Sequence, residues 1–228
     1  MSKKAIPGFA WFIPLAPLAL AAIIYFGNFQ SSSFLYINQF TQKLPDTLWA
    51  WLTFLGNGWG IFALSFPLLL LAPRILTAGI FAGAIAAATS SVLKGIFNLP
   101  RPAGILTEGS FYRIGEALLH RAFPSGHTLT AFAIASAFYF SASKEKRAPL
   151  LLLFVLAAFV GLSRNAVGAH WLTDVLGGAG FGIWCGMIGA WLANHFPESQ
   201  LGPKKIWAHL IARWCCSGLL TLHPKNGS

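Results

Sequence analysis

The chain has 228 residues, of which 56% are hydrophobic and only 10% are charged, and its mean hydropathy is +0.64. Soluble domains carry about 25% charged residues, so this composition excludes an ordinary soluble protein and indicates an integral membrane protein that forms one bundle. The formal net charge is +10, but the basic residues lie mainly at the ends of apolar runs and no basic-aromatic motif is present, which excludes nucleic acid as a partner.

Six apolar runs predict an all-α integral membrane bundle of about six transmembrane helices, with residues 1–228 in a single domain. The expected spans are residues 9–26, 48–72, 75–97, 125–143, 148–162 and 170–193. Each run is close to the roughly 20 residues that a spanning helix needs, although the fifth is short. Lys3 and Lys4 precede the first run and no small-residue cleavage site follows it, which favours a retained helix over a signal peptide. Trp49 and Trp51 open the second run as expected interfacial anchors.

The basic residues between the runs orient the bundle. An even number of spans puts both termini on one side, which also receives Lys3, Lys4, Arg74, Lys144, Lys146, Arg147, Lys204, Lys205 and Arg213. By the positive-inside rule this side is the cytoplasm, so we expect a multi-pass protein of the cytoplasmic (inner) membrane with cytoplasmic termini. The loops around Arg101, His127 and His170 then face the periplasm or the cell exterior, where a bound anion would explain their positive charge.

The C-terminal part of the chain fits this orientation. Residues 204–222 carry apolar and basic side chains on opposite faces, which predicts an interfacial amphipathic helix on the cytoplasmic leaflet. The three cysteines, Cys185, Cys215 and Cys216, match neither a zinc site nor a disulfide framework. Acylation of Cys215 and Cys216 stays open.

A first polar segment, KGIFNLPRP at residues 94–102, lies at the outer end of the third run. Lys94 and Arg101 present two cations there, and the prolines stiffen the exit of the chain. Taken alone, the segment is explained more simply by a snorkelling lysine and a loop arginine, which are common at membrane boundaries.

A second segment, FPSGH at residues 123–127, opens the fourth run. Ser125 is expected to cap the helix, and Gly126 leaves a backbone N–H open to close approach. Because a helix N-terminus with free N–H groups binds anions, His127 would stand beside a bound anion. An ordinary serine-capped helix with an interfacial histidine explains the segment equally well.

The third segment is SRNAVGAHWLTD, residues 163–174. It is expected to be a short loop, carrying Arg164, that opens into a helix with His170 and Asp174 one turn apart. Residues four apart share a helix face, so the carboxylate would fix the tautomer of the imidazole and free its far nitrogen for attack on an electrophile. The alternative is a purely structural His–Asp pair at a helix start.

All three segments fall on the same side of the predicted bundle, and together they supply the groups that phosphoryl transfer requires. In this interpretation His170 attacks phosphorus, His127 protonates the departing oxygen, and Asp174 orients His170 and stabilises its charge. Three cations neutralise the phosphoryl oxygens, and an arginine can bind two such oxygens at once. These cations are Lys94, Arg101 and Arg164.

The three segments together resemble the signature of the type 2 phosphatidic acid phosphatase superfamily, which reads KxxxxxxRP, PSGH and SRxxxxxHxxxD. The resemblance covers about residues 75–193, and every defining position matches. It implies the membrane branch of the family and a metal-independent phosphatase that works through a phosphohistidine on His170, which water then hydrolyses. It also implies that His127 is the general acid, that Ser125 and the Gly126 N–H bind phosphate, and that the substrates are lipid phosphates or lipid pyrophosphates.

A metal cofactor is not expected. Asp174 is the one plausible carboxylate at the predicted site and is already committed to His170, whereas Glu108 and Glu116 are isolated in the sequence. Two-metal phosphatases need several ligands around each ion, and the sequence does not supply them. We therefore expect catalysis without a metal or any other cofactor.

The expected substrate is a lipid phosphate at the outer face of a bacterial cytoplasmic membrane: a polyprenyl pyrophosphate, phosphatidylglycerol phosphate, phosphatidic acid or a lipid A phosphate. The loop at residues 98–123 is expected to cover the site, with Arg113, His120 and Arg121 contacting the headgroup. The expected partners are the lipid and the bilayer, with no obligatory protein partner.

Three other functions share some of these features. A phosphotransferase would use the same phosphohistidine and pass its phosphoryl group to a lipid or sugar. A vanadate-dependent haloperoxidase shares the signature but belongs to a soluble branch, which six apolar spans argue against. An anion or lipid transporter is disfavoured because the ionisable residues cluster at one membrane face and none lies midway in a run.

Overall fold

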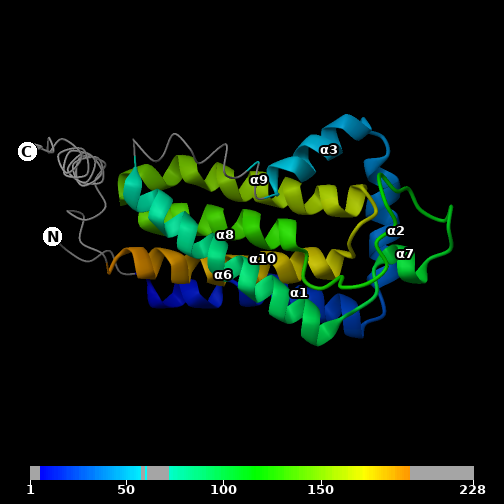
Figure 1. The fold of residues 1–228 in the computed structure, drawn as a ribbon, viewed down its shortest axis with the longest axis horizontal. Coiled ribbons are helices and arrows are strands. Elements are labelled where there is room, and N and C mark those ends of the chain that lie inside the picture. The colour runs from blue at the N-terminus through cyan, green and yellow to red at the C-terminus, as the bar shows by residue number, and fades with distance from the viewer. Residues whose placement is uncertain (1–5, 58–59, 61–71, 196–228) are drawn as a thin grey trace, which may run out of the picture.

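The structure is a computed structural model that describes residues 6–57, 60 and 72–195 (Figure 1). Within these residues every regular element is a helix, which confirms the all-α prediction. The helices are η1 (Gly8–Phe12), α1 (Leu15–Phe26), α2 (Gln30–Thr41), α3 (Asp46–Leu55), α6 (Pro73–Phe97), α7 (Pro102–Ile105), α8 (Gly126–Ser141), η2 (Lys144–Lys146), α9 (Arg147–Ala166) and α10 (Leu172–Ala193).

The described residues contain 4 helical stretches that are long and apolar enough to cross a membrane. They are Gly8–Phe26, Arg74–Ile105, Lys144–Ala166 and Leu172–Ala193. These stretches match the first, third, fifth and sixth predicted runs, so the protein is a multi-pass membrane protein. The expected count of six is not confirmed, because α8 has 16 residues and because much of the second run, residues 58–59 and 61–71, lies outside the described residues. So do the predicted tail helix, Cys215, Cys216, Lys3 and Lys4.

The core of the bundle is built from small residues on α6, α8 and α10. Gly186 of α10 lies so close to α8 that an added Cβ would be 2.5 Å from the Cβ of Ser136, and Gly189 approaches the backbone of α6 at Ala82 in the same way. The Ser136 hydroxyl also donates a hydrogen bond to the Ile183 carbonyl (3.0 Å). Small residues let helices in a membrane approach closely, which explains the glycine-rich composition of α10.

Large apolar side chains point outward from the same helices. On α6 they include Ile80, Val92 and Ile96, and on α9 they include Leu152 and Val155, all of them exposed. Small residues inside and large apolar residues outside are the pattern expected of a bundle that lipid surrounds, since lipid tails solvate apolar side chains as well as a protein core does.

The directions of the helices bring the polar segments together. Figure 1 shows that α6 and α9 end, and α8 and α10 begin, at one end of the bundle, where α2 and α7 also lie. The basic residues of η2 and the start of α9 lie at the opposite end. The three signature segments, far apart in sequence, therefore gather at a single end.

The chain between residues 27 and 51 differs from what its sequence suggests. Residues 30–41 form a regular helix, α2, although their polar side chains are typical of a loop. Trp49, expected as an interfacial anchor, is only 3% exposed, and its Nε1 donates to the Thr41 carbonyl (3.0 Å). It packs against Ala166 and Val167 at the end of α9, so it is a core residue, whereas Trp51 is exposed.

Candidate active site

A buried His–Asp pair lies at the centre of the site. Asp174 Oδ2 is 3.2 Å from His170 Nδ1 and accepts the Trp171 backbone N–H at 2.9 Å. The expectation that His170 lies on the helix was wrong, because α10 begins at Leu172 and His170 occupies the loop before it. Asp174 sits in the first turn of α10, so its carboxylate orients the ring and caps the helix at the same time.

The loop that carries His170 is held by its own backbone. The N–H groups of Ala169 and His170 both donate to the Arg164 carbonyl, at 3.0 and 3.2 Å. The side-chain Nδ2 of Asn165 donates to the His170 carbonyl at 2.7 Å. Asn165 is fully buried and lies inside the third signature segment, yet only the structure shows that it contacts the histidine. These bonds fix the position of the imidazole relative to α9.

Arg164 was expected in a loop, but it belongs to the last turn of α9. Its Nη1 donates to Thr53 Oγ1 of α3 at 3.3 Å, and Thr53 in turn lies 2.9 Å from Ser163 Oγ. The Nε of Arg164 is buried and has no hydrogen-bond partner among the described residues. A buried guanidinium with unused donors is costly unless an anion completes its hydrogen bonding, so this side chain favours a bound oxyanion.

Arg101 connects two loops as well as carrying charge. Its Nε donates to the His120 carbonyl (2.9 Å) and its Nη1 to the Ala169 carbonyl (3.1 Å). The side chain is buried at the start of α7. The residue therefore ties the loop at residues 106–121 to the loop of His170, and its remaining donors are available to an anion.

The N-terminus of α8 presents Ser125, Gly126 and His127. Ser125 occupies the cap position but forms no side-chain cap, contrary to expectation: its Oγ accepts from Thr128 Oγ1 (3.0 Å). The first N–H groups of a helix have no partner within the helix, so the start of α8 remains an anion-binding element. His127 is partly buried, and a Cβ on Gly56, just after α3, would lie 3.1 Å from its Cβ.

Three contacts show that the structure brings the predicted segments together. The second and third segments meet where the Ser125 N–H donates to the Asp174 carbonyl (3.0 Å). The first and third meet at the bond from Arg101 to Ala169. The first and second meet where Lys94 Nζ approaches the start of α8, 3.4 Å from the position of a Cβ built on Gly126.

The predicted headgroup residues lie at the periphery. Arg113 forms an ion pair with Glu108 (3.6 Å) in the outer loop. The side chains of His120 and Arg121 are exposed, and Arg121 has a left-handed backbone with φ of 59°. The structure therefore places these three residues on the loop next to the site and not among the buried groups around His170.

Burial lowers the pKa of His170 well below its ordinary value, and the positive charges of Arg101 and Arg164 act in the same direction. The ring is therefore neutral at neutral pH, because both effects disfavour the imidazolium. A neutral imidazole whose Nδ1 faces Asp174 has its other nitrogen, Nε2, available as a nucleophile.

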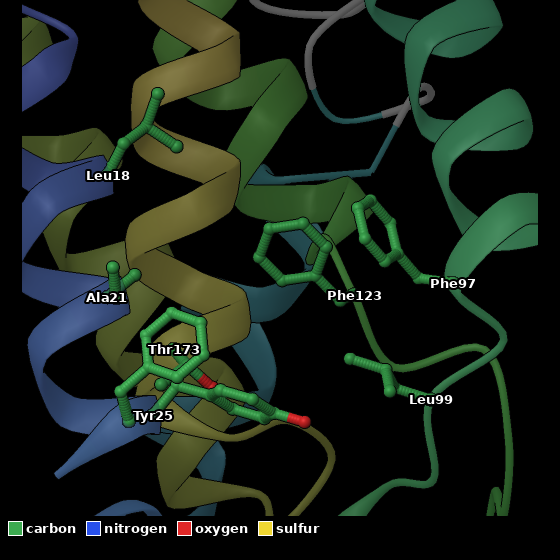
Figure 2. Close-up of a pocket in the computed structure, with 9 residues that line it drawn as sticks. Leu18, Ala21, Tyr25, Phe97, Leu99, Phe123 and Thr173 are labelled. Carbon is green, nitrogen blue, oxygen red and sulfur yellow. The ribbon is translucent and has the colours of Figure 1, made fainter.

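An apolar cavity of about 370 Å³ adjoins these groups (Figure 2). Its walls come from α1, from the start of α10, and from the end of α6 with the loops at residues 98–125. The labelled lining residues are Leu18, Ala21, Tyr25, Phe97, Leu99, Phe123 and Thr173. Phe97 and Phe123 face α1 across the cavity, with their rings 5.4 Å apart. Phe97, Phe123 and Thr173 each lie within three residues of a site residue, so the cavity lies beside the polar cluster.

The residues described by the structure contain no group of three or more His, Cys, Asp or Glu side chains that could hold a metal ion.

Comparison with known proteins adds the family. The sequence model of a family described as the PAP2 superfamily matches residues 75–198. A lipid A 1-phosphatase of Porphyromonas gingivalis is 39% identical over 72 residues, which cover 32% of this chain and 16% of that protein. Phosphatidylglycerophosphatase B of Bacillus subtilis is 34% identical over 103 residues, 41% of this chain and 46% of the relative. The chain thus spans less than half the length of these two curated relatives.

Two solved structures are similar over a larger share. The crystal structure of Aquifex aeolicus LpxE has a TM-score of 0.61 at 32% identity, covering 71% of this chain and 94% of that one. The crystal structure of a transmembrane PAP2 type phosphatidylglycerolphosphate phosphatase from Bacillus subtilis has a TM-score of 0.62 at 21% identity. The match covers 82% of this chain and 98% of that one. The second likeness concerns the fold alone.

Proposed function

The chain belongs to the PAP2 superfamily, and on that premise we propose that it hydrolyses a lipid-linked phosphate or pyrophosphate without a metal, through a phosphohistidine on His170. The observation that carries the proposal is the buried His170–Asp174 pair, surrounded by cationic groups from three different elements. Phosphoryl transfer requires little else from a protein than a positioned nucleophile and electrostatic stabilisation of the phosphoryl oxygens.

In the first step Nε2 of His170 attacks phosphorus, and the bond from phosphorus to the leaving oxygen breaks. Burial and the charge of Arg164 lower the pKa of His127 to about 4, and the phosphate anion beside it opposes this shift, so the protonated ring of the substrate complex donates its proton to that oxygen. Asp174 accepts the hydrogen bond from Nδ1–H and stabilises the positive charge that develops on the ring. In the second step the now neutral His127 takes a proton from water, the water oxygen attacks phosphorus, and the N–P bond breaks to release inorganic phosphate and restore His170.

The groups around His170 bind the phosphoryl oxygens in this mechanism. Arg164 contributes the Nε that lacks a partner in the described structure, and Lys94 contributes its ammonium group beside the start of α8. Arg101 contributes the guanidinium donors that its loop contacts leave over. The Ser125 side chain and the Gly126 N–H complete the set at the helix N-terminus. Charge-assisted hydrogen bonds of this kind are about twice as strong as neutral ones.

The apolar cavity supports a lipid substrate over a water-soluble ester. It lies beside the polar cluster, and its apolar walls can hold the hydrocarbon chain next to a bound headgroup. The named relatives support the same class, because they are a lipid A phosphatase and a phosphatidylglycerophosphatase. The candidate substrates are lipid A phosphates, phosphatidylglycerol phosphate, phosphatidic acid and polyprenyl pyrophosphates.

We place the site at the outer face of the cytoplasmic membrane. The support is the position of Lys144, Lys146 and Arg147 at the end of the bundle opposite to His170, since basic residues at a membrane boundary favour the cytoplasmic side. In this orientation the exposed loop with Arg113, His120 and Arg121 meets the headgroup of an outer-leaflet lipid.

The test is phosphate release by the detergent-purified protein, in EDTA, from a panel of these lipid phosphates and pyrophosphates. We expect release by the wild type from at least one lipid and none by His170→Ala. Release that requires an added metal contradicts the metal-independent mechanism. Transfer of phosphate to an alcohol acceptor without net release would replace hydrolysis by phosphotransfer.

A further inference from the structure

Asn38 of α2 forms a set of buried hydrogen bonds outside the signature segments. This residue is 1% exposed and lies outside the residues matched by the family. Its Nδ2 donates to three carbonyl oxygens: those of Tyr112 (2.9 Å), Asn165 (3.0 Å) and Ala166 (3.2 Å). Its Oδ1 accepts the Tyr112 N–H at 2.8 Å. A single side chain thus joins three segments that are far apart in sequence.

One side of this contact reaches the nucleophile. Asn165 and Ala166 are the last residues of α9, where helix carbonyls have no partner within the helix and depend on outside donors. Asn165 carries the side chain that donates to the His170 carbonyl, and Arg164 precedes it directly. Asn38 therefore holds the backbone from which both the candidate nucleophile and a candidate phosphate ligand are positioned.

The other side of the contact reaches the outer loop. Tyr112 exchanges two hydrogen bonds with the Asn38 side-chain amide. Two residues further along the chain, Ile114 donates its N–H to the Val167 carbonyl (3.2 Å). Arg113, expected to meet the headgroup, lies between them. An amide is the side chain that supplies a donor and an acceptor at once, which explains why asparagine suits this position.

We propose that Asn38 is a positioning residue for the hydrolysis, which fixes the end of α9 and the loop of His170 against the outer loop. The inference rests on the proposed function. It differs from a purely structural role in what it predicts: kcat should fall by a larger factor than KM rises, because kcat depends on the position of His170, whereas the apolar cavity between α1 and α6, which contributes to KM, is not held by Asn38.

The test compares Asn38→Ala, Asn38→Asp and a matched control in detergent. Asn38→Asp keeps the acceptor for the Tyr112 N–H but removes the Nδ2 donor to the Tyr112, Asn165 and Ala166 carbonyls. It therefore breaks every contact on the nucleophile side, keeps one on the loop side, and serves as the second variant if the alanine variant does not fold. The control, Ser136→Ala, loses another buried hydrogen bond between segments, far from the site. Misplacing a reacting group by about 1 Å costs about 100-fold in rate, so we expect a 10- to 100-fold loss of kcat in both Asn38 variants.

In the control, kcat should stay within about 2-fold of the wild type although its Tm falls through the loss of a buried hydrogen bond. Wild-type kcat in a folded Asn38 variant, or a loss that Ser136→Ala reproduces, overturns the inference.

A second measurement is independent of turnover. The Ala169 and His170 amide hydrogens, both bonded to the Arg164 carbonyl, should exchange with solvent deuterium faster in Asn38→Ala than in Ser136→Ala. Equal exchange rates contradict the inference. If the wild type releases no phosphate from any lipid, the proposed function fails, and the exchange rates alone decide whether Asn38 holds this loop.

Discussion

Asp174 has two hydrogen-bond partners in the site, the His170 ring and the Trp171 N–H. Asp174→Asn keeps the size of the side chain and removes its charge, so the ring loses the group that stabilises its positive form. We predict that kcat falls by about 100-fold or more with little change in Tm, measured as phosphate release and by thermal unfolding. A variant that retains more than a tenth of wild-type kcat would contradict the role assigned to the carboxylate.

The protonation of His170 is a second residue-scale prediction. Because burial lowers its pKa well below the ordinary value, the ring should stay neutral as the pH falls through about 6.5, where an exposed histidine gains its proton. Nuclear magnetic resonance of protein labelled at histidine, with the signal assigned through its absence in His170→Gln, measures this directly. A midpoint at or above the ordinary value would show that the ring is more solvated or more strongly paired with Asp174 than the structure indicates.

At the residue scale, sequence spacing identified the groups that meet at the site but not the way in which they are held. Residues 94–102, 123–127 and 163–174 were expected on one side of a bundle, and they do contact one another. The secondary structure of the third segment differs from expectation. A capping contact by Asp174 starts α10 at Leu172, two residues after His170, so His170 lies in a loop and not on the helix. A spacing of four residues between His170 and Asp174 fits two arrangements: both residues on one helix, or a histidine in the loop that leads into the helix. The sequence pattern alone does not distinguish them.

At the scale of elements, the proposed lipid site is the apolar cavity between α1 and the end of α6. Ala22 lines it, so Ala22→Phe should fill part of the space that a hydrocarbon chain would occupy. We predict about a 10-fold higher KM for a long-chain lipid phosphate, equivalent to about 1.4 kcal/mol of lost binding, and a much smaller effect on a short-chain phosphate ester.

The matched control for this prediction is Leu152→Phe, which places the same ring on an exposed, lipid-facing position of α9. Its KM should equal that of the wild type. Equal KM values for Ala22→Phe and Leu152→Phe with the long-chain lipid would mean that the chain does not bind in this cavity.

The long apolar helices were predictable and the short polar one was not. Runs of apolar residues predicted α6, α9 and α10 to within a few residues, because the length of a membrane span constrains them strongly. In contrast, α2 has the sequence QSSSFLYINQFT, whose serines and amides are typical of a loop. Its helix is stabilised by tertiary contacts such as those of the buried Phe34 and Asn38, which a local pattern does not contain.

At the scale of the whole molecule, close contacts between helix backbones hold the bundle together. An added methyl group on Gly186 would collide with α8, whereas one on Gly83 of α6 would meet no atom within 4 Å. We predict that Gly186→Ala destabilises the protein by about 1–3 kcal/mol and that Gly83→Ala does not. Thermal unfolding in the same detergent compares them, and equal Tm values would contradict the packing described for α8 and α10.

The whole fold also explains why the site needs the bundle. His170, Ser125 and Lys94 come from different segments of the chain and become neighbours only because α6 and α9 end where α8 and α10 begin. Composition predicted a membrane bundle, and helix directions followed from the alternation of spans. The positions of α2 and α3 against the end of α9 depend on Asn38, Thr53 and Trp49, whose long-range contacts carry no periodic signal in the sequence.

The central claim is that His170 carries the phosphoryl group, and trapping the intermediate tests it most directly. The protein is mixed briefly with a lipid substrate labelled at the phosphoryl group, quenched in alkali and digested, and the labelled peptide is identified. We predict a label on the peptide containing His170 that survives alkali, is lost in acid as a phosphoramidate should be, and is absent in His170→Ala. Label on another residue, or turnover by His170→Ala at the wild-type rate, would contradict the account.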